Sequence, residues 1–111
     1  MTDANFERNM KALLNQIWMI LVRRDIRRFT KEMKAEDREL MRDCTKEHLI
    51  KFHRGHGRYL RNEFRSGHYR GLCGHCHKLV RSKGEDLSFD APSSVAIELI
   101  WEALTSQKER N

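Results

Sequence analysis

Two cysteines and three histidines fall within ten residues of the stretch His68–Val80, HYRGLCGHCHKLV. Cys73 and Cys76 are separated by two residues, the spacing at which two thiolates chelate one tetrahedral zinc ion from a tight turn. The pair supplies half of a four-ligand site. We therefore predict a structural zinc site in this segment, with a reduced pair of thiols in a loop as the alternative.

The remaining ligands of such a site would be histidines from the same part of the chain: His53, His56, His68, His75 and His77. His53 and His56 are favoured, because side chains three residues apart on a helix are neighbours, and their ligation would tie the segment to a core helix. His77 directly follows Cys76 and would bind only in a strained turn. The alternative for His56 is a core position in which its ring hydrogen-bonds to a neighbour.

The same residues match two redox patterns. The run from Cys73 to His77 has the Cys-x-x-Cys-His spacing of c-type haem attachment, and Cys73 with Cys76 has that of a thioredoxin-type pair. Haem is disfavoured because its attachment requires export, and the most apolar stretch, Ile17–Val22, lacks the features of a signal peptide. We expect a cytoplasmic protein, in the host cytoplasm if a phage encodes it, with its cysteines reduced.

A second chemical feature is a concentration of arginines. The formal net charge is +6, but residues 51–83 alone carry about +8. Arginine presents a planar fork of donors that matches phosphate and carboxylate groups. The sequence therefore predicts an anion-binding surface made of the arginines of this segment: Arg54, Arg58, Arg61, Arg65, Arg70 and Arg81.

Helices are the elements expected to position these residues. From Phe6 to Phe29, apolar residues recur at spacings of three and four, which predicts a helix. Its tryptophan and methionine side chains are expected to pack in a core, although a helix that is apolar over more than half of its circumference also favours association. Residues 35–43 predict a short acidic helix.

Residues 45–65 predict a helix whose two sides differ. At 100° per residue the apolar side carries Leu49, Phe52, His56, Tyr59, Leu60 and Glu63, and the basic side carries Lys51, Arg54, Arg58, Arg61 and Arg65. Gly55 and Gly57 each weaken this helix by about 1 kcal/mol relative to alanine. The sequence leaves open whether the helix breaks there or another backbone approaches closely.

Residues 66–89 contain four glycines and no sustained period, so we expect a loop insertion that carries the Cys/His site. Residues 89–106 predict a last helix, with Asp90 as its cap and Pro92 in its first turn. The 111 residues are expected to form a single domain, an all-α bundle of about four helices. No apolar run approaches the length of a membrane span, and we expect no membrane partner.

Two segments resemble an uncharacterised family of bacterial and phage domains, a domain of unknown function. They are LIKFHRGHGRYLRNEF (residues 49–64) and FDAPSSVAIELIWEAL (residues 89–104). The positions that resemble the family's motif are His53, Gly55, Gly57, Arg61, Asn62, Asp90, Ser94, Glu98 and Trp101. This sequence differs at His56, where the family usually has leucine, and in its Cys-rich segment. Because the family has no assigned activity, the resemblance implies a fold and not a function.

We expect a non-enzymatic binding or regulatory protein whose basic surface contacts an anionic partner, either nucleic acid or an acidic protein surface. One alternative is a phage-type inhibitor or adaptor that docks on a host protein. Another is a small metal-dependent nuclease or hydrolase that uses His56, Arg61, Asn62 and Glu63. The enzyme is less favoured, because no nucleophile and base occur together. Homo-oligomerisation stays open.

Overall fold

The computed structural model describes residues 3–82 and 90–110, and the regular secondary structure in these two ranges is entirely helical. The α-helices are α1 (Asp3–Glu32), α2 (Ala35–Asp43), α3 (Ile50–Arg65), α4 (Arg70–Ser82) and α5 (Asp90–Arg110). A 3-10 turn, Glu47–Leu49, leads into α3. The all-α prediction is confirmed, and the described residues hold one α-helix more than the four or so expected.

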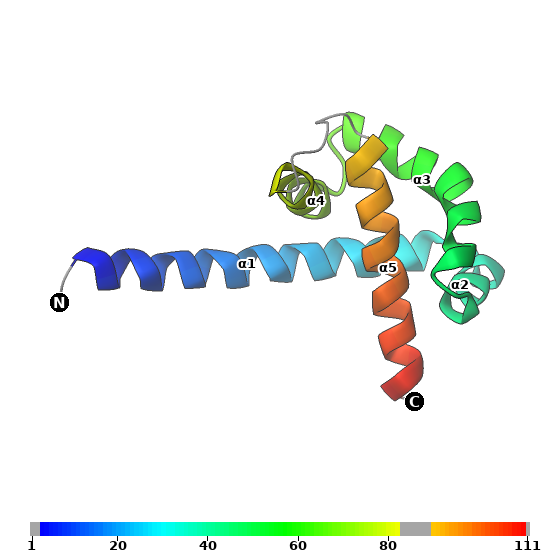
Figure 1. Cartoon of the computed structure of the whole chain (residues 1–111), viewed down its shortest axis with the longest axis horizontal. Coiled ribbons are helices and arrows are strands. Elements are labelled where there is room, and N and C mark those ends of the chain that lie inside the picture. Colours follow the sequence, from blue (N-terminus) through cyan, green and yellow to red (C-terminus); the bar gives the residue numbers. More distant parts are fainter. Residues whose placement is uncertain (1–2, 83–89, 111) are drawn as a thin grey trace.

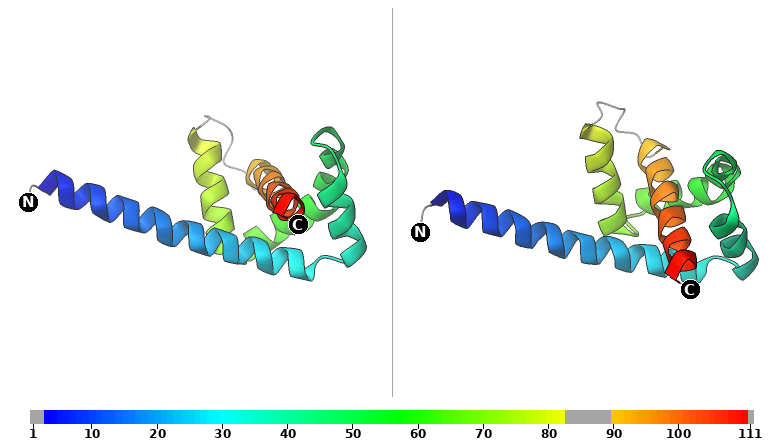
Figure 2. Two further views of the ribbon diagram at one scale, coloured as in Figure 1. Left: turned by 90° about the horizontal axis from the view of Figure 1, so that it is seen from below. Right: turned by 60° about the horizontal axis from the view of Figure 1, so that its bottom comes forward.

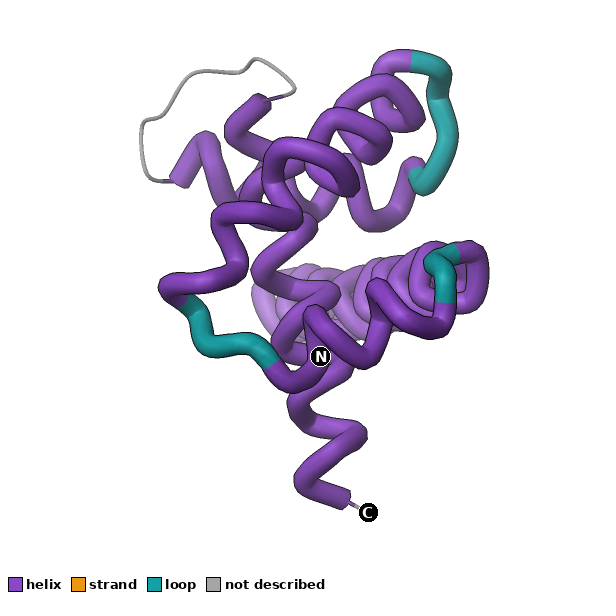
Figure 3. Tube along the Cα trace, turned by 90° about the vertical axis from the view of Figure 1, so that its right-hand side faces the viewer, coloured by secondary structure: helices purple, strands orange, loops and turns teal. Residues whose placement is uncertain are grey.

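Helix α5 lies at the centre, and α1, α2, α3 and α4 all pack against it. In Figure 1 it crosses α1, with α4 on one side and α2 and α3 on the other. Figure 3, seen nearly along α1, shows that short turns join the first four helices. The side chains that α5 contributes to the core are Ala96, Ile97, Ile100 and Leu104, each at most 2% exposed. They lie within an arc of about 100° of the helix, and four other helices contact α5, so α5 holds the bundle together.

Helix α3 is continuous through both of its glycines. Gly57 is buried, and a β-carbon placed there would lie 3.9 Å from Ile97 of α5, which is ordinary contact. Gly55 faces open space. The helix ends in a Schellman motif: His68 N–H donates to the Glu63 carbonyl and Gly67 N–H donates to the Phe64 carbonyl. Gly67 takes the left-handed conformation that this motif requires (φ 83°).

The expected loop of residues 66–89 is wrong for most of its length, because residues 70–82 form α4. Residues 83–89 of that prediction lie outside the described part of the chain. Leu72, Cys76 and Val80 recur every four residues, and each is fully buried. These residues give α4 an apolar side that packs on α5.

Helix α1 stabilises the start of α4. The carboxylate of Asp25, which is only 3% exposed, accepts a hydrogen bond of 3.1 Å from the backbone N–H of Leu72. Leu72 lies in the first turn of α4, where backbone N–H groups have no partner within the helix. A residue of α1 therefore caps α4 from 47 positions earlier in the sequence.

The close contact between α1 and α4 requires Gly71. A β-carbon at this position would lie 2.9 Å from the β-carbon of Leu21 and 3.1 Å from Oδ2 of Asp25. A β-carbon at Gly74, one turn later, would lie 3.4 Å from the indole ring of Trp18. The glycines of the Cys/His segment thus allow two helix backbones to approach each other.

We predict opposite effects of the same substitution at two glycines of the chain. Gly71→Ala should lower the free energy of unfolding by about 1–3 kcal/mol, because the α1 and α4 backbones must separate. Gly55→Ala should raise it by about 0.5–1 kcal/mol, because the exposed site has room and alanine favours helix. Urea denaturation of both variants checks this; equal effects would contradict the packing of α1 on α4.

The first half of α1 departs from the expected core packing. Phe6, Met10, Leu13, Leu14, Ile17, Trp18 and Ile20 are each 40–60% exposed. Figure 2 shows this half of the helix extending well beyond the other helices, so nothing in the described chain covers it. No helix in the described ranges is both long and apolar enough to cross a bilayer.

Candidate functional site

The basic side of α3 forms a continuous surface. Its side chains fall within an arc of about 80° and span about 21 Å of helix. We call this surface the arginine face of α3, and its members are Lys51, Arg54, Arg58, Arg61 and Arg65. All of them are exposed except Arg61, which is half-buried.

Two members of the arginine face lack acidic partners among the described residues. Arg54 and Arg58 make no ion pair or side-chain hydrogen bond with the described residues. They lie four residues apart, so their charges are neighbours on the helix surface. Like charges at this spacing destabilise a helix by about 0.2–0.5 kcal/mol. An anion bound between them would remove that cost.

The arginine face borders a small cleft between α3 and the first turns of α5. The cleft has a volume of about 240 Å³ and is lined by His53, Arg54, Gly57, Arg58, Arg61, Ser93 and Ser94. The N-terminal end of a helix carries a partial positive charge, which adds to that of the arginines. Cationic side chains, serine hydroxyls and a helix N-terminus together make a local environment that favours an anion.

His53 contributes the imidazole at the cleft. Its Nδ1 atom is buried and has no hydrogen-bond partner among the described residues. A buried polar atom without a partner costs about 1–3 kcal/mol. A polar atom of a ligand in the cleft would supply the partner that this Nδ1 atom lacks among the described residues.

The structure brings together four of the nine positions that resemble the family motif: His53, Gly57, Arg61 and Ser94 line the cleft. Asn62 is exposed on α3, Glu98 is half-buried on α5, and Gly55 lies on the opposite side of α3. Trp101 donates its indole N–H to the carbonyl of Cys44 at 3.1 Å, which fastens α5 to the end of α2. The side chain of Asp90 lies outside the described part.

Arg70 and Arg81 do not extend the arginine face along α3. Both belong to α4, at its two ends. The guanidinium of Arg70 donates to the carbonyl of Gly67 at 3.1 Å and so closes the turn between α3 and α4. Arg81 is exposed near the end of α4. The anion-binding prediction is therefore best supported for the arginines of α3.

The predicted zinc ligands are distributed over two helices. Cys73 and Cys76 lie one turn apart on α4, followed by His77, whereas His53 and His56 lie on α3. Within residues 3–82 and 90–110, no three His, Cys, Asp or Glu side chains gather closely enough to hold a metal ion. The zinc site stays a prediction from the spacing of the cysteines.

Burial affects both thiols of α4. Cys76 is fully buried in the core, and burial, with a smaller effect of the neighbouring Cys73, raises its pKa to about 12. Burial also raises the pKa of Cys73. In the described structure Cys76 belongs to the hydrophobic core, and Cys73 packs against it.

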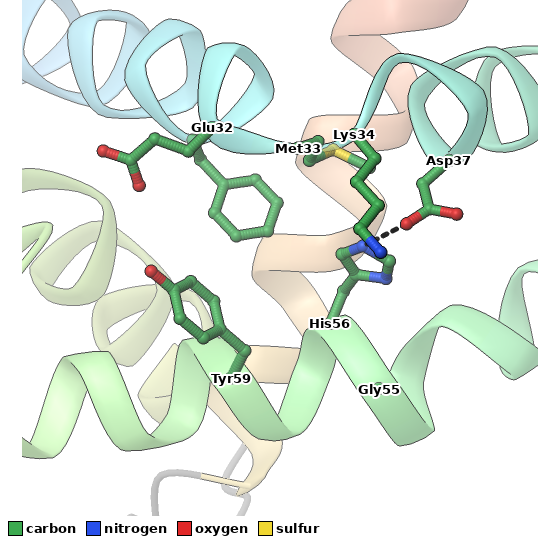
Figure 4. Close-up of a pocket in the computed structure, with 8 residues that line it drawn as sticks. Glu32, Met33, Lys34, Asp37, Gly55, His56 and Tyr59 are labelled. Atoms are coloured by element: carbon green, nitrogen blue, oxygen red, sulfur yellow. Dashed lines mark ion pairs between the residues drawn. The ribbon is translucent and has the colours of Figure 1, made fainter.

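His56 occupies a second cleft, about 300 Å³ in volume, between the end of α1, α2 and α3 (Figure 4). Its Nε2 lies 3.6 Å from Oδ2 of Asp37, and its ring packs near Phe29 and Phe52. His56 is half-buried beside two aromatic rings, with a polar neighbour supplied by α2, so the structure shows the apolar packing of the core alternative without full burial. Sequence reasoning did not find Asp37, because the two residues lie on different helices.

A cluster of paired polar groups borders this second cleft. The hydroxyl of buried Tyr69 donates to the carboxylate of Glu32, and His68 pairs with Glu63. Burial, followed by the neighbouring Glu32 carboxylate, raises the pKa of Tyr69. Tyr69 adopts a left-handed conformation (φ 52°), which its buried ring and its bond to Glu32 hold in place at the start of α4.

The side chains considered for a hydrolase are spread around α3. His56 pairs with Asp37. Glu63, which lies two helical turns after His56 on α3, pairs with His68. Arg61 lies on the other side of α3, toward Ser93 and Ser94. An acid and a base positioned on one substrate would have to lie within hydrogen-bond reach of it.

Comparisons with protein-family models, curated proteins and solved structures found no match to this chain. The resemblance to the bacterial and phage domain family stays a prediction from its motif residues.

Proposed function

We propose that this protein is a non-enzymatic binding module that contacts the phosphate backbone of nucleic acid through the arginine face of α3. The observation that carries the proposal is the pair Arg54 and Arg58, which lie side by side in solvent without acidic partners in the described structure. They belong to a row of like charges that costs the folded protein stability and that a polyanion would neutralise.

The shape of the arginine face favours nucleic acid over an acidic protein surface. Its cations follow a strip about 21 Å long on an uninterrupted helix, which suits a row of phosphates. An acidic protein partner, including a host protein bound by a phage-type adaptor, is the competing outcome.

Base stacking is not part of the proposal. Tyr69, one of the two tyrosines near the basic segment, is only 6% exposed and bonded to Glu32. Tyr59 is exposed, but it lines the second cleft on the side of α3 away from the arginine face. We therefore expect recognition of backbone charge, with little dependence on base sequence.

The cleft between α3 and α5 would bind a phosphate more strongly than the rest of the arginine face. A phosphate at its mouth would lie near Arg54, Arg58 and the N-terminal end of α5. We also propose that the protein works in a reducing compartment such as the cytoplasm, because Cys44, Cys73 and Cys76 are free thiols.

We predict that the double variant Arg54→Gln/Arg58→Gln binds a fluorescein-labelled 20-base-pair duplex about tenfold more weakly than the wild type in fluorescence anisotropy. The loss follows from two missing phosphate contacts, and it should be the same for duplexes of unrelated sequence. Both side chains are exposed, so thermal stability should not fall.

The matched control is Arg8→Gln/Lys31→Gln, which removes the same charge from exposed positions of α1. It should weaken binding less than threefold. Equal losses of duplex affinity in the two double variants would show that the effect comes from net charge alone. That result would overturn the arginine face as the binding surface. Binding of a defined protein partner at fixed stoichiometry, with no affinity for any duplex, would support the adaptor instead.

A further inference from the structure

The projecting half of α1, residues 3–20, is an amphipathic helix without a partner in the described chain. Its seven large apolar side chains, from Phe6 to Ile20, are each 40–60% exposed. At 100° per residue they occupy an arc of about 160°, and the asparagines, Arg8 and Lys11 lie on the other side. The projection is plain in both views of Figure 2. We call this apolar side the arm face.

The arm face is not a continuation of the side of α1 that packs in the bundle. Val22, Asp25 and Phe29 are buried toward the other helices, and their common direction is about 90° around the helix axis from the centre of the arm face. Both sides can therefore be occupied at once. Trp18 lies between them, next to Gly74 of α4.

The apolar side of this arm is exposed over its whole length. Residues 3–17 are exposed throughout, and a contiguous exposed apolar surface of this size marks an interaction site. A second helix lying along the arm face would bury the apolar side chains and stabilise the arm.

We infer that the arm face binds the arm face of a second copy of this chain, with the two helices antiparallel. The charges of α1 favour this pairing. Its first turns carry the acids Asp3 and Glu7, and the residues that follow the arm carry Arg23, Arg24, Arg27 and Arg28. An antiparallel pair centred between Leu13 and Leu14 sets Phe6 opposite Leu21 of the second copy.

In that register the acids of each copy meet the arginines of the other. Asp3 lies opposite Arg24, and Glu7 lies within a turn of Arg23. A parallel pair would set Asp3 against Asp3 and Arg24 against Arg24, which is repulsive at both ends. Charge complementarity therefore selects the antiparallel arrangement.

The apolar area is sufficient for a stable dimer. Seven large side chains at about half exposure correspond to on the order of 700 Å² per chain, or about 1,400 Å² for two copies. Specific interfaces bury about 1,200–2,000 Å² in total. The inference does not depend on the proposed binding of nucleic acid, because the arm face and the arginine face lie on different helices.

The test is sedimentation velocity of the full-length protein at concentrations between about 1 and 100 µM, which gives the mass of the species in solution. This range covers the dissociation constants expected for such an interface. We expect twice the monomer mass of 13.3 kDa at the upper end of this range. Leu13→Glu/Ile17→Glu should be monomeric throughout. The control Leu40→Glu/Ile50→Glu changes two apolar residues of α2 and α3 that are more exposed than Leu13 and Ile17, and should remain dimeric.

Orientation is tested by charge reversal. Arg24→Glu alone should weaken the dimer about tenfold, and adding Asp3→Arg should restore the wild-type affinity, because the opposed pair is re-formed with exchanged signs. Rescue supports the antiparallel pairing; no rescue overturns it.

A wild-type protein that is monomeric up to about 100 µM would overturn the inference, and binding of that monomer to anionic lipid vesicles would identify a membrane surface as the occupant. A dimer that survives Leu13→Glu/Ile17→Glu would overturn it as well, since the contact would lie elsewhere. Duplex binding by the monomeric variant would leave the proposed function intact, so the two proposals fail separately.

Discussion

Asp25→Ala is expected to lower the free energy of unfolding by about 2–3 kcal/mol. The carboxylate is 3% exposed, and it accepts the hydrogen bond of the Leu72 N–H at the start of α4. Alanine leaves that donor buried without a partner and removes a negative charge from the N-terminal end of a helix. Urea denaturation followed by far-ultraviolet circular dichroism measures the loss.

Asp25→Asn provides the matched control. The amide oxygen of asparagine can still accept from Leu72, so only the charge is lost, and we expect a decrease of about 1 kcal/mol. If the alanine variant were as stable as the wild type, or if both variants lost the same amount, the cap from α1 to α4 would not be the source of the stability.

The second large effect concerns alkaline pH. Burial raises the pKa of Cys76 from an ordinary 9.0 to about 12, so the thiol ionises in the unfolded chain well before it does in the folded protein. Its contribution to stability is complete below about pH 9 and is lost as the pH rises toward 12. The expected slope is about 1.4 kcal/mol per pH unit, or a loss of about 2–3 kcal/mol by about pH 11.

The measurement is urea denaturation at several pH values from about 8 to 11, for the wild type and for Cys76→Ala. Alanine creates a small cavity and lowers stability at every pH, but the variant should show a shallower decline above about pH 9, since it has no thiol to ionise. Tyr69, whose pKa is also raised, contributes to the decline at the highest pH in both proteins. Parallel curves for the two proteins would contradict the burial of Cys76.

Most of the helices could be predicted from the sequence, because their apolar residues recur with the helical period. The segments predicted over 6–29, 35–43, 45–65 and 89–106 correspond to α1, α2, α3 and α5. Helix α4 was missed, since Gly71 and Gly74 suggested a loop and the cysteines suggested a metal site. Treating Cys76 as a small apolar residue reveals the spacing Leu72, Cys76, Val80.

The meaning of the glycines in α4 depends on tertiary structure. Position 71 must be glycine because a β-carbon there would collide with Leu21 and Asp25. These two residues lie about 50 positions earlier in the chain, and no local pattern indicates that contact. The same holds for Asp25, a charged residue on the buried side of α1 that would be placed in solvent by its type alone. Long-range pairs of this kind are set by how the helices pack.

The candidate site was predictable in part. The shared direction of Arg54, Arg58 and Arg65 follows from a continuous helix, whereas the cleft that Ser93 and Ser94 complete depends on how α5 crosses α3. The partners of His56 and Tyr69, which are Asp37 and Glu32, were not found, because each lies on a different helix from the residue it pairs with.

The most direct test of the arginine face is the salt dependence of duplex binding by the wild-type protein. Fluorescence anisotropy with two 20-base-pair duplexes of unrelated sequence, at several salt concentrations between about 50 and 200 mM, gives the slope of log affinity against log salt. Four or five phosphate contacts predict a slope of about −4, equal for both duplexes. No binding at the lowest salt concentration, or a slope near zero, would contradict a face built to neutralise phosphates.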